Sequence, residues 1–330
     1  MQGLADVVHK LWHTLRSGGL GGRAESIDEV RLANKLLDTN EIANLRQRAL
    51  SLIDYHKNHK PVLHRQHGEH PSPRRGYGLD YEESRVYQPG DELRFMNWRL
   101  TARTGEPYVK VFREERRPSV FILLDQRNSM RFGTRVRLKV TQAVRVAILL
   151  AFYNQYCGRS VSGLIVDEGL QWLDTSIDEQ STLGLVSRMN QACPPRALNG
   201  EEPDISGIFR ALHSALTPGT RVYVLSDFFD LNRDCDSVLA QLAAEHEFSA
   251  IHIVDPAEQQ LPKAGKLRLS ASTLGQARQV DSANPYISQQ YHNAAQQHLA
   301  GRETQLRSLG IGYVRVPSTT ESFENDLVFI

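Results

Sequence analysis

A run of five apolar residues, Val120 to Leu124, ends abruptly at Asp125, and the polar residues that follow do not extend it. A short unbroken apolar run of this kind predicts a strand that is buried on both faces, as in parallel sheets. Three later runs have the same form and also stop at an aspartate: Ser162–Val166 at Asp167, Arg221–Leu225 at Ser226-Asp227, and Phe248–Val254 at Asp255. The pattern predicts buried strands with an acidic residue at the carboxyl end of each.

Helical patterns separate these strands. Five segments are predicted to be helical, at 136–156, 182–189, 204–216, 237–245 and 285–309; the first has a continuous apolar face, and the last is long and polar. Two further segments, 265–269 and 277–280, predict a hairpin at an edge of the sheet, and 312–316 predicts the last strand. Strands that alternate with helices indicate an α/β fold, in which a doubly wound, mostly parallel sheet is covered by helices on both faces.

The chain before the first buried strand consists of three segments that differ in composition and pattern. Residues 1–25 contain a glycine-rich break and predict a flexible leader. Residues 26–73 combine an amphipathic pattern of one or two helices with a loop rich in histidine and proline. Residues 74–117 predict short strands separated by turns, which make a small β subdomain, and residues 118–330 then form the α/β domain.

The histidine-rich loop raises the question of a zinc site, because histidine is a common zinc ligand. Its histidines are His56, His59, His64, His67 and His70. The loop has no cysteine, and its prolines argue against a helix that would align the imidazole rings. We therefore expect a solvated loop here rather than a metal site.

Composition narrows the class of protein only a little. The apolar content of 40% and the charged content of 23% are ordinary for a globular chain, and the net charge of +1 gives no argument for nucleic acid as a partner. No apolar run approaches the ~20 residues of a membrane span. Three widely spaced cysteines, without a CxxC pair, favour a reducing compartment, so we expect a cytoplasmic protein.

Basic residues interleaved with aromatic ones mark the predicted β subdomain. Arg94, Arg99 and Arg103 lie close to Trp98 in this segment. Such a pattern can bind nucleic acid through phosphate contacts and base stacking. Acidic residues are interspersed with the arginines, so local ion pairing is the preferred interpretation.

The strand ends are the candidate functional site. Carboxyl ends of parallel strands meet at one edge of a sheet, where open α/β folds bind ligands. Asp125, Ser129 and Asp227 are expected there, and their oxygen atoms suit a hard cation such as Mg²⁺. Like charges gathered at one edge need a cation or hydrogen-bond donors, although any single aspartate could simply cap the turn that follows it.

These strand-end residues resemble a known domain. The pattern Asp125-x-x-x-Ser129 after a buried strand, with Asp227 after a later strand, is similar to the von Willebrand factor A domain. In that fold, a loop of pattern Asp-x-Ser-x-Ser, a threonine from a second loop and an aspartate from a third hold a magnesium ion, and a partner's carboxylate completes the shell. The resemblance implies a Rossmann-like sheet of this type.

A second resemblance is more specific. The segments Tyr87–Arg94, Asn97–Arg99 and Tyr108–Glu115 resemble the bacterial domain-of-unknown-function family number fifty-eight, whose members are often encoded beside MoxR-type AAA+ ATPases. The similarity covers roughly Gly68 to Val316. It implies a non-enzymatic adaptor of such an ATPase in protein maturation or complex assembly, with other von Willebrand factor A-domain proteins as further candidate partners.

The chain departs from the metal-binding pattern at two positions. Arg127 stands where the middle serine of the loop is expected, and Pro203-Asp204 lies where the threonine of the second loop is expected. We hypothesise that the Arg127 guanidinium takes the place of the cation between Asp125 and Asp227, since arginine can bind two carboxylates. The alternatives are a weak Mg²⁺ site at Asp125, Ser129 and Asp227, or an Arg127 side chain that points into solvent.

The expected function is protein binding without a cofactor. The candidate partner-binding residues are Arg127 and Asp204 at the strand ends and Arg94, Arg99 and Arg103 in the β subdomain. No P-loop, GxGxxG or Ser-His-Asp order is found in the sequence. The alternative function is a metal-dependent hydrolase that uses the strand-end carboxylates, for which the chain offers a minimal ligand set and no obvious nucleophile.

Overall fold

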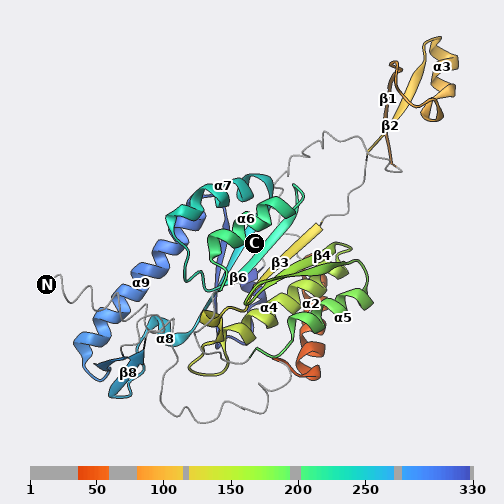
Figure 1. Cartoon of the computed structure of the whole chain (residues 1–330). Helices are drawn as coiled ribbons and strands as arrows, with labels where there is room; N and C mark the ends of the chain where they lie inside the picture. Colours follow the sequence, from red (N-terminus) through yellow and green to blue (C-terminus); the bar gives the residue numbers. More distant parts are fainter. Residues whose placement is uncertain (1–35, 59–79, 114–118, 194–201, 271–276, 328–330) are drawn as a thin grey trace. The chain divides into compact units, whose positions relative to one another are not determined.

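A computed structural model describes residues 36–58, 80–113, 119–193, 202–270 and 277–327 of the chain. These residues fall into two compact units (Figure 1). The sheet unit is built from 36–58 together with the described residues from 119 onward, and the small unit is built from 80–113. Each unit is considered by itself.

A six-stranded sheet forms the centre of the sheet unit. Its strands, in spatial order, are β10 (Gly312–Pro317), β7 (Glu247–Val254), β6 (Arg221–Ser226), β3 (Ser119–Asp125), β4 (Ser160–Val166) and β5 (Leu170–Ser176). All neighbouring strands are parallel except β5, which is an antiparallel edge strand paired with β4. The predicted mostly parallel α/β sheet is therefore confirmed.

The strand order reverses beside β3. After β3 the chain first builds β4 and β5 on one side, and it then returns to build β6, β7 and β10 on the other. This reversal places a topological switch point between β3 and β6, at whose carboxyl end ligands of doubly wound sheets bind. Asp125 ends β3, and Asp227 directly follows β6.

Helices cover both faces of the sheet (Figure 1). On one face lie α2 (Thr39–Asn58), α4 (Lys139–Tyr156) and α5 (Glu179–Met189), and on the other lie α6 (Ile205–Ala215), α7 (Asp236–Glu245) and part of α9 (Pro285–Ser308). Alternate residues of β3 pack into the two hydrophobic cores, one on each face of the sheet: Ile122 packs with α4, whereas Phe121 packs with α6. This division explains why the β3 run is apolar at every position. Within the described residues, no helix is long and apolar enough to span a membrane.

Helix α2 is part of the sheet unit. Its residues Leu45 and Ala49 are buried in the same core as α4. The Asn190 side chain joins the start of this region to α5, accepting from Leu37 N at 2.7 Å and donating to Leu37 O at 2.9 Å. Within residues 36–58 one helix is observed, and the Asp38 side chain caps it by accepting from Glu41 N. The leader and the histidine-rich loop from His59 onward lie outside the described residues.

The predicted hairpin exists, but it does not extend the main sheet. Strands β8 (Lys266–Ser270) and β9 (Ala277–Asp281) form a separate antiparallel sheet. Their residues Leu267 and Val280 pack instead against Tyr291 of α9 in a small core of their own. The prediction of an edge position was wrong because the apolar side of the hairpin is buried by α9, an arrangement that local patterns do not encode.

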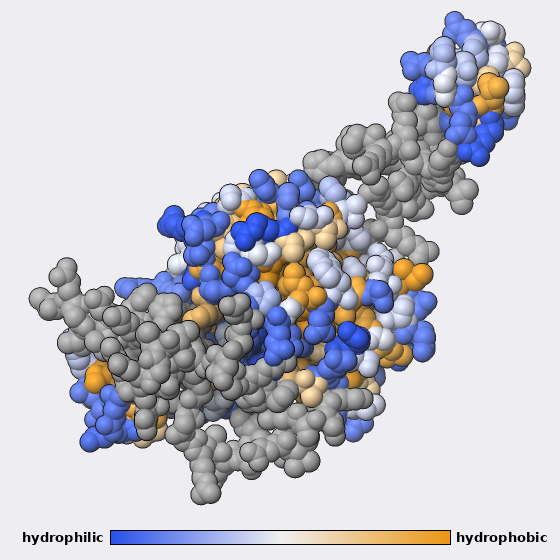
Figure 2. Space-filling view, viewed as in Figure 1, coloured by the Kyte–Doolittle hydropathy of each residue, from blue (hydrophilic) through white to orange (hydrophobic). Residues whose placement is uncertain are grey.

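The small unit pairs β1 (Asp80–Val86) with β2 (Tyr108–Arg113) in antiparallel register. Between them the chain forms the 3₁₀ helix η1 (Leu93–Phe95) and the short helix α3 (Trp98–Thr104), so the prediction of strands alone was wrong there. Asn97 caps α3 by accepting from Leu100 N, and Gly105 ends it in a left-handed conformation with φ of 81°. The face of the small unit that Figure 2 shows is mainly polar, yet the Trp98 side chain is 67% exposed.

Candidate functional site: the strand-end rim

Four aspartates lie at the carboxyl ends of four adjacent parallel strands, and we call these residues the rim. They are Asp125 of β3, Asp167 after β4, Asp227 after β6 and Asp255 after β7. Asp125, Asp227 and Asp255 are each at most 1% exposed. A buried carboxylate is costly unless it is paired or hydrogen-bonded, so each must have donors inside the protein.

All four rim residues are bound by one segment, residues 127–139, which connects β3 to α4 and contains the 3₁₀ helix η2 (Asn128–Arg131). The pairs are Asp125 with Arg127, Asp167 with Arg131, Asp255 with Thr134, and Asp227 with Lys139. A single connection therefore supplies three cations and a hydroxyl to four strand ends. Every rim carboxylate is therefore hydrogen-bonded from within the chain.

Arg127 lies at the centre of this arrangement and is only 5% exposed. It binds Asp125 through Nε to Oδ1 at 3.1 Å and Nη2 to Oδ2 at 2.9 Å. It binds Asp230 through Nη1 to Oδ2 at 2.6 Å and Nη2 to Oδ1 at 3.0 Å, and Nη1 also donates to Pro203 O at 3.0 Å. One guanidinium thus bridges two carboxylates bidentately, the geometry in which such ion pairs are strongest.

The second carboxylate is Asp230 and not Asp227, which corrects our expectation. The chain turns sharply after Asp227, where Phe228 adopts a positive φ of 48° and donates from its backbone N to Ser226 Oγ. Beyond this turn Asp230 meets Arg127, and it also accepts from Ile205 N at 2.9 Å at the start of α6. Arg127 therefore joins the loops that follow β3 and β6 to the beginning of α6.

Asp227 belongs to a second, fully buried cluster. Lys139 is the first residue of α4, and its Nζ lies 2.7 Å from Asp227 Oδ2 and 2.6 Å from Glu258 Oε1. Glu258 comes from the short helix α8 (Pro256–Gln259). Neither Lys139 nor Glu258 was among the residues predicted for the site. The only available signal was a lysine between Leu138 and Val140, two residues of the apolar face of the predicted helix.

The charge of Arg127 is secured by its surroundings. Burial alone would lower the pKa of the guanidinium, but the carboxylates of Asp125 and Asp230 outweigh this effect and raise the pKa well above its ordinary value. Arg127 therefore remains a cation at every pH at which the protein is folded. The hypothesis that its side chain points into solvent is wrong.

The candidate metal ligands do not fit a divalent cation. Both oxygens of Asp125 accept hydrogen bonds from Arg127, and Oδ2 also accepts from Ser226 Oγ at 2.6 Å. Asp227 accepts from Lys139 and from Phe229 N, while Ser129 is half-buried in η2 and bonds to neither aspartate. Among the described residues, no group of three or more His, Cys, Asp or Glu side chains could hold a metal ion. The hydrolase alternative, which needs such a group, gains no support from this geometry.

The accessible surface around the rim comes from other residues. Asp204 is exposed at the start of α6 and caps that helix by accepting from Gly207 N. Glu202 is exposed and accepts from Asn128 N at 2.8 Å, and the Asp230 side chain is 30% exposed. In the β3–α4 connection, Arg135 is exposed and the Val136 side chain is 56% exposed. A partner would touch these groups, because Arg127 itself is buried beneath them.

The other candidate residues lie on the small unit. Arg94, Arg99 and Arg103 are all exposed, and Arg94 pairs with Glu92 and lies over the Phe95 ring. Arg99 and Arg103 are four positions apart on α3, so they share one face of that helix. The pairing of Arg94 agrees with the preferred interpretation of local ion pairing, whereas no ion pair with another described residue is found for Arg99 or Arg103.

Comparison with known proteins places the chain among relatives of unknown function. A family model described as "Protein of unknown function DUF58" matches residues 83–301. The uncharacterized protein Rv1480 of Mycobacterium tuberculosis (strain ATCC 25618 / H37Rv) is 30% identical over 247 residues, which cover 74% of this chain and 76% of that protein. The uncharacterized protein Mb1516 of Mycobacterium bovis (strain ATCC BAA-935 / AF2122/97) matches to the same extent.

Among solved structures, the conserved hypothetical protein BatB from Bacteroides thetaiotaomicron is 16% identical, covers 64% of this chain and 94% of its own, and gives a TM-score of 0.38. The SpRpn10 VWA domain is 14% identical with the same coverage of both chains and a TM-score of 0.34. The fold assignment rests on the strand order observed here, because similarity at this level adds nothing to it.

Proposed function

Because this chain belongs to the family described as "Protein of unknown function DUF58", we propose that it is a non-enzymatic interaction module and an adaptor of a MoxR-type AAA+ ATPase. The rim and the exposed residues around it are the proposed docking face. ATP hydrolysis belongs to the partner in this proposal, and the chain itself needs no cofactor. The cytoplasm, where such ATPases meet their clients, is the proposed location.

The observation that carries the proposal is that every rim carboxylate is hydrogen-bonded by the connection between β3 and α4. Arg127, Arg131 and Lys139 occupy the carboxylates that a catalytic metal or a substrate would otherwise use. Buried and fully hydrogen-bonded groups hold a surface rigidly, which lowers the entropic cost of binding a partner. Such a site is suited to recognition and has no free base or nucleophile at its centre.

The chemistry of the docking face suggests the chemistry of the partner. Glu202, Asp204 and Asp230 make one side of the accessible surface acidic, and Val136 provides an exposed apolar contact beside Arg135. Complementary charges steer association and fix orientation. We therefore propose that a basic surface of the ATPase, with an apolar contact at its centre, docks here.

The small unit provides a second proposed contact. Trp98 is 67% exposed on α3, next to Arg99, and Arg103 follows one turn later. Tryptophan and arginine are enriched among residues that dominate binding energies at interfaces. The candidate arginines of the small unit therefore keep their proposed role in partner binding.

Co-purification tests the proposal. The full chain should retain a MoxR-type AAA+ ATPase of the same organism, in the presence of either Mg²⁺ or a chelator. Asp204→Asn keeps the helix cap but removes the charge, and Val136→Lys places a positive charge opposite the basic partner, so the double variant should reduce retention at least tenfold while leaving the fold intact. Arg307→Ala, an exposed change on α9, is the matched control. If the chain retains a different von Willebrand factor A-domain protein and no ATPase, that protein would replace the ATPase as the proposed partner.

A further inference from the structure

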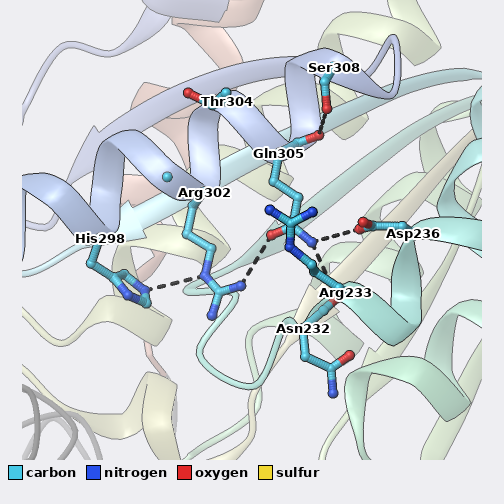
Figure 3. A pocket seen from close by; sticks show the side chains of 9 residues that line it. Asn232, Arg233, Asp236, His298, Arg302, Thr304, Gln305 and Ser308 are labelled. Atoms are coloured by element: carbon cyan, nitrogen blue, oxygen red, sulfur yellow. Dashed lines mark hydrogen bonds between the residues drawn. The ribbon is translucent and has the colours of Figure 1, made fainter.

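A surface hollow of about 610 Å³ lies between α9 and the 3₁₀ helix η3 (Arg233–Cys235) (Figure 3). Polar side chains of the hollow bond to one another. Gln305 Nε2 donates to Asp236 Oδ1 at 2.7 Å, and Arg302 Nη1 donates to Gln305 Oε1 at 3.3 Å. These bonds tie the two walls together within the chain and call for no ligand, in contrast to one edge of the main sheet.

Strand β5 forms this edge, and among the described residues it pairs with β4 alone. Its register is regular from Leu170, opposite Val166, to Leu173, opposite Gly163. One extra residue then shifts the register in the second half of the strand. The outward N–H and C=O groups of an edge strand can pair with a strand of another chain. The first half of β5 therefore offers a regular backbone to such a strand.

The opposite edge, β10, is protected against further pairing. Its Arg315 side chain pairs with Glu303 of α9 at 3.1 Å, the strand ends at Pro317, and α9 and α10 (Glu324–Leu327) pack against it. Charged side chains, proline and a covering helix are common means of blocking a strand edge. Strand β5 contains no proline, lysine or arginine, and its one charged residue, Asp174, lies in the irregular half.

Large apolar side chains are exposed along β5. Trp172 is 45% exposed, and Ile177, which directly follows the strand, is 61% exposed. The centroid of the Trp172 ring lies 5.9 Å from that of the buried Phe121 ring, so the core holds one part of the indole while the rest remains accessible. Tryptophan is enriched among residues that dominate binding energies at interfaces. An added strand would therefore gain side-chain contacts as well as backbone hydrogen bonds.

Unpaired carboxylates give this edge a negative charge. Residues 160–187 contain five acidic residues and no lysine or arginine. Asp174 and Asp178 are exposed and form no ion pair with another described residue, and Asp178 instead caps α5 by accepting from Ser181 N at 2.8 Å. Charge complementarity therefore favours a basic partner. A second copy of this chain would bring two acidic edges together, and like charges across paired strands are destabilising.

From these features we propose that the edge of β5 binds an extended basic segment of a protein partner, which joins the sheet as a further strand. Backbone hydrogen bonds to Leu170–Leu173 supply affinity, an apolar side chain of the segment rests on Trp172, and a basic side chain meets Asp174. This site lies along the side of the sheet and takes a partner in an extended conformation. It therefore goes beyond the proposed docking of an ATPase at the rim and does not depend on it.

The test uses fluorescence anisotropy of a labelled peptide of alternating lysine and valine with the full chain at low salt. Saturable binding is expected, and a peptide of alternating glutamate and valine should bind at least about tenfold more weakly. Two further peptides carry backbone N-methyl groups, one on every valine and the other on every lysine. Alternate residues of a strand direct their N–H groups to opposite sides, so one methylated peptide should bind like the parent and the other should lose binding.

Two substitutions in the chain test the side-chain contacts. Trp172→Ala should weaken binding of the lysine–valine peptide about tenfold or more, and Tyr286→Ala, at a 59% exposed position of α9, is its matched control. Asp174→Lys should weaken binding about fivefold, because it turns one attraction into a repulsion. Its control is Glu106→Lys, the same change of charge at an exposed position of the small unit. Thermal unfolding of each variant confirms that it is folded.

Four outcomes would overturn the proposal. The first is no saturable binding, and the second is equal binding by the two N-methylated peptides, which would show attraction by charge alone. The third is equal binding by the Trp172 and Asp174 variants and their controls. The fourth is a dimer of the free chain that the peptide dissociates, which would assign the edge to a second copy. An ATPase takes no part in these readouts, so this proposal and the proposed function fail separately.

Discussion

Arg127 and Asp230 are joined by two hydrogen bonds, of 2.6 and 3.0 Å, although 103 positions separate them in the chain. The same guanidinium holds Asp125 by two further hydrogen bonds. In the von Willebrand factor A pattern that the sequence resembles, a metal ion joins the loops at the strand ends. Here the Arg127 side chain makes this connection. Unlike a metal ion, it has no coordination position that a partner's carboxylate could fill.

Removal of the Arg127 side chain should destabilise the protein strongly. Arg127→Ala leaves Asp125 buried without its counter-ion, and breaking a buried pair in this way costs roughly 3–5 kcal/mol. Urea unfolding followed by circular dichroism measures the loss of unfolding free energy. Arg135→Ala, an exposed change in the same connection, should shift the free energy by less than about 0.5 kcal/mol. Equal effects of the two variants would show that the bridge contributes nothing special.

Magnesium should not bind to the rim. Asp125 and Asp227 already accept hydrogen bonds from Arg127 and Lys139, so a cation would have to displace a buried charge. Isothermal titration calorimetry of the wild-type chain with MgCl₂ should show no saturable heat. Micromolar binding that disappears in Asp227→Ala would contradict the idea that an arginine replaces the ion, and it would restore the weak metal site as the better interpretation.

The sequence was sufficient to predict the sheet because each strand carries its own signal. Val120–Leu124 is apolar at successive positions, and Asp125 ends the run. The closeness of Asp125 to the end of β6 then followed from the parallel geometry. A single strong local pattern, repeated four times, thus specified most of the fold.

Which side chains pair with one another at the rim could not be predicted in the same way. Asp227 and Asp230 are three positions apart, and the choice between them depends on the turn at Phe228. The roles of Lys139 and Glu258 depend on contacts 119 positions apart in the chain. Such convergence is set by tertiary packing, and a single sequence holds no direct record of it.

The Lys139 cluster should show strong coupling between its members. Lys139→Met leaves Asp227 and Glu258 buried together without a cation, which should cost roughly 3–5 kcal/mol of unfolding free energy. The triple variant Lys139→Met, Asp227→Asn, Glu258→Gln removes all three charges and should recover a large part of this loss. Urea unfolding of the single and triple variants measures the difference. A triple variant less stable than Lys139→Met would argue that the charges themselves, rather than their balance, stabilise the rim.

Stability should fall as the solution becomes acidic, partly because of His246. This residue is buried after α7, and neither ring nitrogen has a hydrogen-bond partner among the described residues. Burial lowers the pKa of the His246 imidazole, so the folded state resists protonation more than the unfolded state does. The unfolded chain therefore takes up the proton first, near the ordinary pKa of about 6.5. Stability conferred by the neutral ring is complete above that pH and is lost as the pH falls below it.

Replacement of the ring tests this assignment. His246→Phe cannot be protonated, so the difference in unfolding free energy between wild type and variant should shift in favour of the variant between about pH 7 and pH 5. His292→Gln is the control, because His292 is only half-buried and its Nδ1 has a partner in Gln259 O. Parallel pH profiles for wild type and His246→Phe would assign the acid sensitivity to other groups. The rim carboxylates, which pair with Arg127, Arg131 and Lys139, would then be the next groups to test.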